Sequence, residues 1–241
     1  MAKGFFITGT DTGVGKTVIS AAIVRLLKGM GYSVCAMKPL ESGCVRKGES
    51  LIPTDGTFLR TMAGMEEDIK VVTPYAFEAP LAPMAAAELE GADIDTGKIK
   101  RIFAGLSKKY DAAVVEGVGG LLVPIKRDYF VLDLIGELGL PVIIVSRPGL
   151  GTINHTLLTA RCAIGAGVRV AGIVINENCR PKGRCRPEDS DPSRRTNPGI
   201  IRELAGVPLL GIFPFLDEIS GAALEKAARE NLDADLIRSY I

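Results

Sequence analysis

The feature that most restricts the fold of this chain is a glycine-rich stretch near its start, GTDTGVGKT at positions 9–17. It follows the apolar run Phe5–Thr8 and precedes a segment whose apolar residues recur at helical spacing up to Met30, with Gly31 as the expected C-terminal glycine. A strand, a glycine-rich turn and a helix in this order are typical of a phosphate-binding loop. The usual motif has its first glycine at position 10, where this chain has Thr10, so the loop is a variant.

Short apolar runs alternate with helical patterns along the rest of the chain. This alternation predicts an α/β fold of P-loop NTPase type, with a mostly parallel central sheet and helices on both faces, in a single domain over residues 1–241. The expected strands are Phe5–Thr8, Val34–Lys38, Ala112–Glu116, Val142–Ser146, Val170–Asn176 and Leu209–Phe213. Further helices are expected at Asp55–Met62, Ile153–Gly165, Pro198–Leu204 and Ala222–Asn231.

Charge and hydropathy argue against large anionic partners. Lys and Arg number 29 against 28 Asp and Glu, and this balance gives no bulk attraction to nucleic acid or to an anionic membrane. No apolar run approaches the length of a membrane span or of a signal-peptide core. We therefore expect a cytoplasmic protein with small-molecule substrates.

The segment 178–197 is too rich in proline and charge to predict a helix or strand, and we expect a long basic loop inside the domain. Either it is a solvated, mobile loop or it closes over a nucleotide as a lid. Cys179 and Cys185 flank its basic part, and a cytoplasmic location favours reduced thiols over a bridge between them. With five cysteines, no C-x-x-C pair and one histidine, His155, which we expect to be structural, a zinc site is not expected.

Polar and glycine residues cluster directly after the predicted strands. Parallel strands place their carboxyl ends along one edge of the sheet, where open α/β folds bind ligands, so we expect one site to gather these segments. The segments are 9–17, 38–43, 116–120, 146–154, 176–177 and Pro214.

Within the glycine-rich stretch, backbone N–H groups and the helix dipole are suited to hold a polyphosphate. Lys16 is expected to reach the β- and γ-phosphates, and the Thr17 hydroxyl to ligate Mg²⁺. The alternative is a helix capped by Asp11 or Thr12 with incidental glycines. The strand before the loop and the helix after it favour nucleotide binding.

Three charged residues elsewhere are candidates for the same site. Glu116 ends a buried apolar run, where nucleotide-binding folds place a magnesium ligand, although it would also suit a cap on the glycine turn that follows. Asp55 begins a helical segment and is nearly as well explained as a helix N-cap. Lys38 closes a strand, where it would stabilise charge developing on a phosphate or would simply be solvated.

Five segments together resemble the dethiobiotin synthetase family, in the family's order and over nearly the whole chain. They are Gly-Thr-Asp-Thr-Gly-Val-Gly-Lys-Thr at 9–17, Lys-Pro-x-x-Ser-Gly at 38–43, Val-Glu-Gly-x-Gly-Gly at 115–120, Gly-x-Ile-Asn-His at 151–155 and Gly-Ile-x-Pro at 211–214. The offset of one residue in the first segment is that family's spacing.

The resemblance implies an ATP- and Mg²⁺-dependent ligase that closes a cyclic urea on 7,8-diaminononanoate with CO₂ in biotin biosynthesis. One substrate amine forms a carbamate, ATP phosphorylates it, and the second amine displaces phosphate to give dethiobiotin. The reaction depends on positioning and charge stabilisation, so it needs no Ser-His-Asp arrangement.

The resemblance also implies the roles of individual residues. Lys16 and Lys38 would be catalytic, Thr17, Asp55 and Glu116 would hold Mg²⁺, and Thr12 and Ser42 would lie near the diamine. Gly151 and Asn154 would reach substrate bound to the other subunit of a homodimer. Nucleotide contacts would come from Gly13, Val14, Gly15, Lys16, Thr17, Val18, Asp55, Glu116, Gly117, Val118, Gly119, Asn176, Glu177, Phe213, Pro214 and Phe215.

One departure and two alternatives bear on this interpretation. The family has Asn-Asp where this chain has Asn176-Glu177, so the longer acid leaves base selectivity open. A partitioning or positioning ATPase would carry an extra lysine where this chain has Asp11, and a basic C-terminal helix where this chain is acidic. The synthetase half of a cobyrinate-type amidotransferase would require a glutaminase domain, for which no residues remain.

Overall fold

A six-stranded parallel sheet forms the centre of the structure, a computed structural model that describes residues 3–178 and 192–241. Most strands are continuous apolar runs in which every residue is buried, as expected where helices cover both faces of a sheet. Their spatial order is β12 (Leu209–Phe213), β11 (Val170–Asn176), β10 (Val142–Ser146), β1 (Gly4–Gly9), β7 (Ala112–Glu116) and β2 (Val34–Met37).

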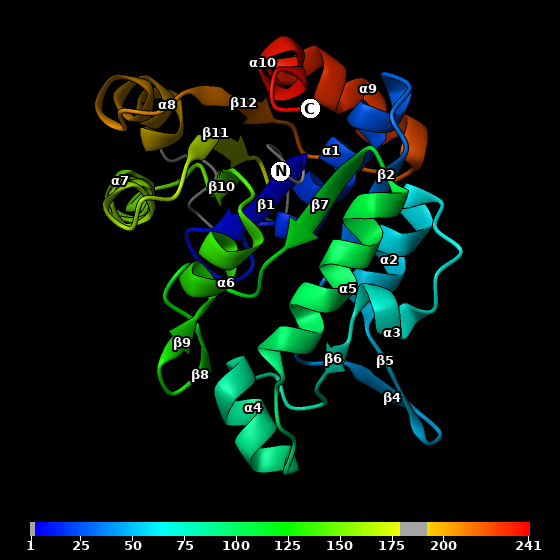
Figure 1. Cartoon of the computed structure of the whole chain (residues 1–241). Coiled ribbons are helices and arrows are strands. Elements are labelled where there is room, and N and C mark those ends of the chain that lie inside the picture. The colour runs from blue at the N-terminus through cyan, green and yellow to red at the C-terminus, as the bar shows by residue number, and fades with distance from the viewer. Residues whose placement is uncertain (1–2, 179–191) are drawn as a thin grey trace.

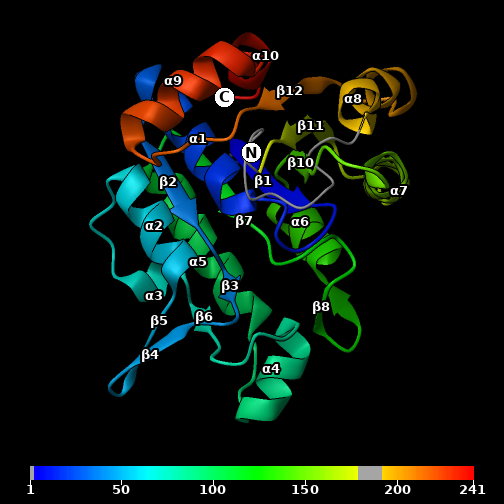
Figure 2. The ribbon, with the colours of Figure 1, turned by 180° about the vertical axis from the view of Figure 1, so that it is seen from behind.

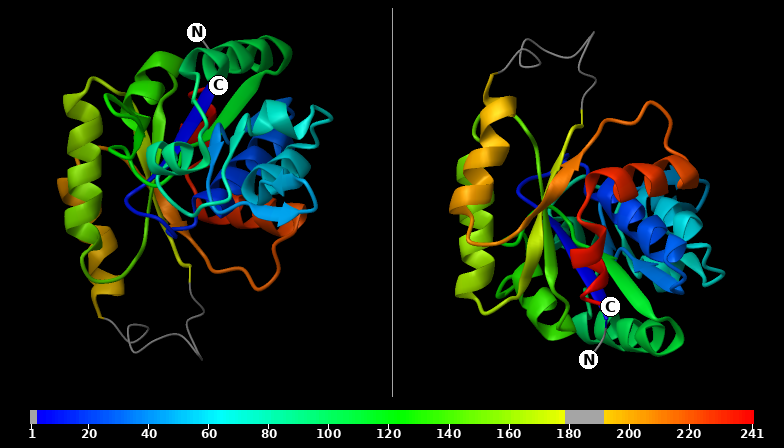
Figure 3. Two further views of the ribbon diagram at one scale, coloured as in Figure 1. Left: turned by 90° about the horizontal axis from the view of Figure 1, so that it is seen from below. Right: turned by 90° about the horizontal axis from the view of Figure 1, so that it is seen from above.

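The direction of each crossover decides which face its helix covers, because crossovers between parallel strands are right-handed. Figure 3 shows α7 and α8 on one side of the strands and α1, α2 and α9 on the other. The order of the strands changes side at β1, with β2 and β7 on one side of it and β10, β11 and β12 on the other. Open α/β folds bind ligands at such a point, beyond the carboxyl ends of the strands. The helices are α1 (Lys16–Gly29), α2 (Thr54–Ala63), α3 (Ile69–Val72), α4 (Pro83–Glu90), α5 (Thr96–Lys109), α6 (Val131–Leu138), α7 (Thr152–Gly165), α8 (Ser193–Leu204), α9 (Gly221–Asn231) and α10 (Ala234–Arg238).

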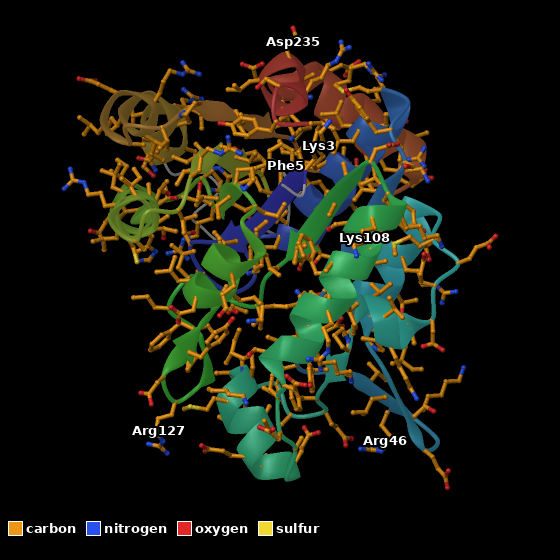
Figure 4. All side chains as sticks on the ribbon, viewed as in Figure 1. Lys3, Phe5, Arg46, Lys108, Arg127 and Asp235 are labelled. Atoms are coloured by element: carbon orange, nitrogen blue, oxygen red, sulfur yellow. The ribbon has the colours of Figure 1, made fainter. Side chains whose placement is uncertain are left out.

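Three small two-stranded sheets lie outside the central sheet, and they extend the molecule downward in the view of Figure 1. Figure 2 shows β2 leading down into β3 and on to the β4–β5 hairpin, with α4 beneath. Arg46 on β4 and Arg127 beside β8 lie at the outer rim, whereas Phe5 lies within the body of the molecule (Figure 4). The strands of these small sheets are β3 (Leu40–Glu41) with β6 (Tyr75–Ala76), β4 (Val45–Lys47) with β5 (Ser50–Ile52), and β8 (Pro124–Lys126) with β9 (Tyr129–Phe130).

The predicted α/β fold and all six predicted strands are confirmed, with bounds that shift by a residue or so. Lys38, for example, lies just after β2 and not within it. Several helices were not predicted, although α5 carries a clear signal: Ile99, Phe103 and Leu106 are buried at helical spacing after the N-cap Asp95. Across residues 3–178 and 192–241, no helix is both long enough and apolar enough to span a membrane.

The prediction of a loop over residues 178–197 is wrong at its end. Helix α8 begins at Ser193 and includes Pro198, the residue at which we expected that helix to begin. The earlier start places Asn197 inside the helix, where it is buried and its amide donates to the carbonyl oxygens of Pro148 and Gly149, at 2.9 and 3.1 Å. Residues 179–191 lie outside the described part, and with them the predictions of a lid and of the state of Cys179 and Cys185.

Candidate active site

The phosphate loop joins β1 to α1 as the sequence predicts. Gly15 is the N-cap of α1 with φ 88°, a left-handed conformation that favours glycine. Within the described residues no side chain caps this helix, and its first turn contains no acid. The N-terminal N–H groups of α1 therefore point at the place where an anion would bind. This excludes the alternative of a helix capped by Asp11 or Thr12.

Lys16 is buried at the start of α1, where 7% of the residue is exposed. Its Nζ donates a hydrogen bond to the carbonyl oxygen of Asp11 at 3.1 Å, so the side chain folds back over the loop. Burial and the nearby ammonium of Lys38 lower the pKa of Lys16 to about 8, against the opposing effect of Glu116. A dianionic phosphate is a suitable partner for two ammonium groups held this close together.

Lys38 and two carboxylates form a buried cluster beside the loop. Lys38 Nζ lies 2.5 Å from Glu116 Oε1 and 3.3 Å from Asp55 Oδ2, and it also donates to the Gly117 carbonyl oxygen at 3.2 Å. Burial alone would lower the pKa of Lys38, but Glu116 and Asp55 raise it above its ordinary value. Lys38 is therefore charged, and it is 4% exposed, which excludes the alternative of a solvated strand end.

Glu116 has the donor set that a hard cation requires. Its Oε1 accepts a hydrogen bond from Thr17 Oγ1 at 2.9 Å, and its Oε2 is buried with no hydrogen-bond partner among the described residues. An unsatisfied carboxylate oxygen beside a threonine hydroxyl fits Mg²⁺, which takes oxygen ligands. No three His, Cys, Asp or Glu side chains gather into a metal site in residues 3–178 and 192–241, and Mg²⁺ commonly uses only one or two carboxylates with water and phosphate oxygens.

Asp55 lies in the first turn of α2, and its interpretation as a helix N-cap is wrong. The N-cap is Pro53, and the backbone N–H groups of Asp55 and Gly56 donate to the carboxylate of Glu41, both at 2.9 Å. The Asp55 side chain is thereby left to face Lys38. Glu41 was not predicted, because a helix cap that comes from a distant strand leaves no signal in the sequence next to the helix.

A cavity of about 500 Å³ lies over these groups. It brings together the predicted phosphate, magnesium and diamine residues, and it adds Glu41, Pro80, Leu81, Ala82 and Val123, which were not predicted. Its lining is Thr12, Gly13, Gly15, Lys16, Thr17, Lys38, Glu41, Ser42, Asp55, Pro80, Leu81, Ala82, Glu116, Val118, Gly119 and Val123.

The residues expected around the nucleotide base lie outside this cavity. Asn176 is buried, and its amide donates to the Val14 carbonyl oxygen at 2.9 Å, so it braces the phosphate loop. Glu177 forms an ion pair with Arg194 of α8. Phe213 is fully buried in the core, whereas Phe215 is 37% exposed.

Three further predicted contact residues lie near these groups. Pro214 is half-buried between Phe213 and Phe215. Val14 is buried in the core, and Val18 is half-buried and packs against it.

Gly151 and Asn154 also lie outside the main cavity, and both are exposed at the start of α7. A second cavity of about 350 Å³ separates the phosphate loop from α7, with Leu122, Leu158 and Cys162 in its lining. Leu122 and Leu158 are 63% and 59% exposed. The structure of one chain therefore brings the phosphate and magnesium residues together, but it does not bring the α7 residues to them. His155 lies half-buried on α7, away from both cavities.

Comparisons with solved structures support the fold. The chain resembles the septum site-determining protein MinD of Pyrococcus horikoshii, with a TM-score of 0.55 at 18% identity, covering 98% of this chain and 93% of that one. It also resembles a ParA family ATPase of Chlorobium tepidum, with a TM-score of 0.52 at 14% identity, covering 97% and 92%. At such identities the likeness concerns the fold alone.

Comparisons of sequence are more specific. A family model described as an AAA domain matches residues 3–223. The ATP-dependent dethiobiotin synthetase BioD of Thermodesulfovibrio yellowstonii is 44% identical, over 99% of this chain and the whole of that protein. The proteins of the same name from Bacillus licheniformis and Bacillus subtilis are 41% and 38% identical, over 99% of this chain and 97% and 99% of theirs. The chain belongs to the ATP-dependent dethiobiotin synthetase family.

Proposed function

We propose that this chain closes a cyclic urea on 7,8-diaminononanoate, using CO₂ and ATP and releasing dethiobiotin, ADP and phosphate. The observation that carries the proposal is the cavity in which two buried lysines and two carboxylates meet the N-terminus of α1. One amine adds to CO₂ as a carbamate, and a carbamate oxygen takes the γ-phosphoryl group of ATP. The second amine then attacks the carbamoyl carbon, and phosphate leaves with the bonding electrons.

The two lysines have different parts in this scheme. Lys16 and the N–H groups of α1 hold the phosphate chain of ATP. Lys38 is fixed by Glu116 and by the Gly117 carbonyl oxygen, so its charge is already in place when negative charge develops on the transferring phosphoryl group.

Thr17, Asp55 and Glu116 would hold Mg²⁺. The bound ion would neutralise charge on the phosphate oxygens. Two observations support this ligand set. Glu116 Oε2 has no hydrogen-bond partner among the described residues, and the Asp55 side chain points at the same cluster.

The diamine would occupy the part of the cavity between Thr12 and Ser42, with its hydrocarbon chain against Leu81. Its carboxylate would lie beyond one chain's cavity and would be received by Gly151 and Asn154 of a second copy. A homodimer with shared sites is therefore part of the proposal, and the exposed Leu158 suits its interface. A cytoplasmic location remains a prediction from the sequence.

The test is ADP release in a coupled assay, with the organic product identified by mass. We expect release to require both the diamine and bicarbonate, with one dethiobiotin formed per ADP. Release that ignores the diamine but responds to DNA or vesicles would instead support a positioning ATPase. Release that ignores the diamine but requires ammonia would support the synthetase half of an amidotransferase.

A further inference from the structure

Glu41 is a buried acid in the cavity for which the proposed chemistry has no use. It lies on β3, 4% exposed, between Lys38 and the hairpin that leads to α2. A carboxylate buried in this way is unfavourable unless donors satisfy it. The donors come from α2: the N–H of Asp55 to Oε1, the N–H of Gly56 to Oε2, and the Thr54 hydroxyl to Oε1 at 3.4 Å.

The carboxylate of Glu41 thus caps the N-terminus of α2, and such a cap from a distant residue is unusual. A local Ser, Thr, Asp or Asn is the common solution, but α2 has Pro53 at the N-cap, and no side chain there caps it. The cap from Glu41 ties two segments together: the one that carries Lys38 and Ser42, and the helix that carries Asp55. Hydrogen bonds to a charged acceptor are about twice as strong as neutral ones, so this tie restricts how the two segments move against each other.

The first turn of α2 is also packed closely against its surroundings. A Cβ on Gly56 would lie 1.9 Å from the Thr73 Oγ1 and 3.5 Å from Glu41 Oε2. Only a glycine lets the backbone come this near, and the backbone is the part of α2 that Glu41 holds. The position of the Asp55 backbone is therefore fixed from both sides, and its Oδ2 lies 3.3 Å from Lys38 Nζ.

We infer that Glu41 is a positioning residue: by holding the N–H groups of Asp55 and Gly56, it fixes the Asp55 carboxylate opposite Glu116 and so sets the affinity of the site for Mg²⁺. The inference rests on the proposed function in one respect, the assignment of Asp55 as a magnesium ligand. Glu41 touches neither substrate nor metal in this role. Outer-shell partners of metal ligands typically contribute about 10–100-fold to metal affinity.

The experiment measures ADP binding by calorimetry with and without Mg²⁺, in the absence of the diamine. For Glu41→Ala we expect unchanged ADP affinity without Mg²⁺. The factor by which Mg²⁺ increases ADP affinity, here called the Mg²⁺ enhancement, should fall about 10-fold or more. Asp55→Asn should lose a similar amount, and the double variant should lose little more, because both changes act on one ligand.

Asp95→Ala is the matched control, because Asp95 is an acidic N-cap that accepts from the Lys98 N–H on α5, away from the cavity. It should lower the melting temperature and leave the Mg²⁺ enhancement as in the wild type. Glu41→Gln keeps one accepting oxygen and should fall between the wild type and Glu41→Ala. If the alanine variant does not fold, the measurement is made on Glu41→Gln alone.

The possible failures are distinct. A folded Glu41 variant with the wild-type Mg²⁺ enhancement would show that Glu41 only caps the helix. That result would contradict the inference and leave the proposed function untouched. A wild-type protein whose ADP affinity ignores Mg²⁺ would contradict the proposed ligand set itself. Failure to form dethiobiotin, with Mg²⁺ effects as expected, would contradict the proposed reaction and leave the inference standing.

Discussion

The two ends of the candidate site are built differently. At the phosphate end, Lys16, Lys38 and Glu116 are 7%, 4% and 1% exposed, and hydrogen bonds link each of them to another part of the same chain. At the α7 end, Gly151 and Asn154 are exposed and lie outside the main cavity. One chain therefore organises the phosphate end before any ligand arrives, whereas it leaves the α7 end exposed and outside the cavity.

In the proposed function the two ends have different parts: the phosphate end would determine the rate, and the α7 end would depend on assembly of the dimer. Preorganised charges in a buried site act on the transition state without reorganising. A group presented on an exposed helix start acts only when something is brought to it. The following predictions test that division, from the largest expected effect to the smallest.

Lys38→Ala should lower kcat about 10²–10³-fold, or about 2.7–4 kcal/mol, because it removes a preorganised positive charge. The affinity for ATP should change less. Steady-state kinetics on protein shown by circular dichroism to be folded would measure this, since loss of one partner of a buried ion pair also lowers stability. Lys108→Ala, at an exposed lysine on α5 (Figure 4), is the control. A normal kcat for Lys38→Ala would remove the assigned role.

Mixing two inactive variants tests whether the α7 end belongs to the partner. Lys16→Ala and Asn154→Ala should each be nearly inactive as homodimers. A mixed dimer would contain one site with both residues intact, so activity should return to about half of the wild type per mixed dimer. Mixed dimers confirmed by native mass spectrometry but no more active than their parents would contradict the shared site, and a monomer would remove its premise.

Asn197→Ala should loosen the loop before α7, because its amide holds the Pro148 and Gly149 carbonyl oxygens. We expect a loss of about 1–3 kcal/mol in the free energy of unfolding by urea, together with a raised KM for the diamine and an unchanged KM for ATP. Asn231→Ala on α9 removes a similar side-chain bond, to the Ala227 carbonyl oxygen, and should affect stability only. If both variants raise the KM alike, Asn197 has no specific connection with the substrate.

Two cysteines differ in burial, one near the phosphate end and one on α7. Cys44 is buried beside β3, and burial raises its thiol pKa to about 11, whereas Cys162 is half-buried and lines the second cavity near α7. Since the thiolate is the reactive form, Cys44 should react slowly with iodoacetamide until the pH approaches 11, and Cys162 should react faster at pH 8. Peptide mapping by mass would separate these from the other cysteines, and equal rates would contradict the difference in burial.

Local sequence signals predicted the phosphate loop, α1 and the strands, because a loop that binds phosphate has a fixed spacing and a strand buried on both faces is a continuous apolar run. Non-local contacts decided two features that were predicted wrongly. Asp55 could not be distinguished from a helix cap, since the true cap, Glu41, comes from a different strand. The start of α8 at Ser193 was missed, and its early part contains Asn197, which bonds to the distant loop before α7.

The position of β1 in the sheet determines when the phosphate loop can become functional during folding. Phe6 pairs with Val115 of β7 on one side and with Val142 of β10 on the other, so both neighbours of the first strand come from much later in the chain. Contacts between such distant segments form slowly, because the intervening chain must first be closed into loops. A ribosome-bound chain would therefore carry its nucleotide-binding loop from the beginning of synthesis but could not hold it in shape until β10 had emerged. Nucleotide binding would therefore follow the pairing of β1 with β7 and β10 and could not precede it.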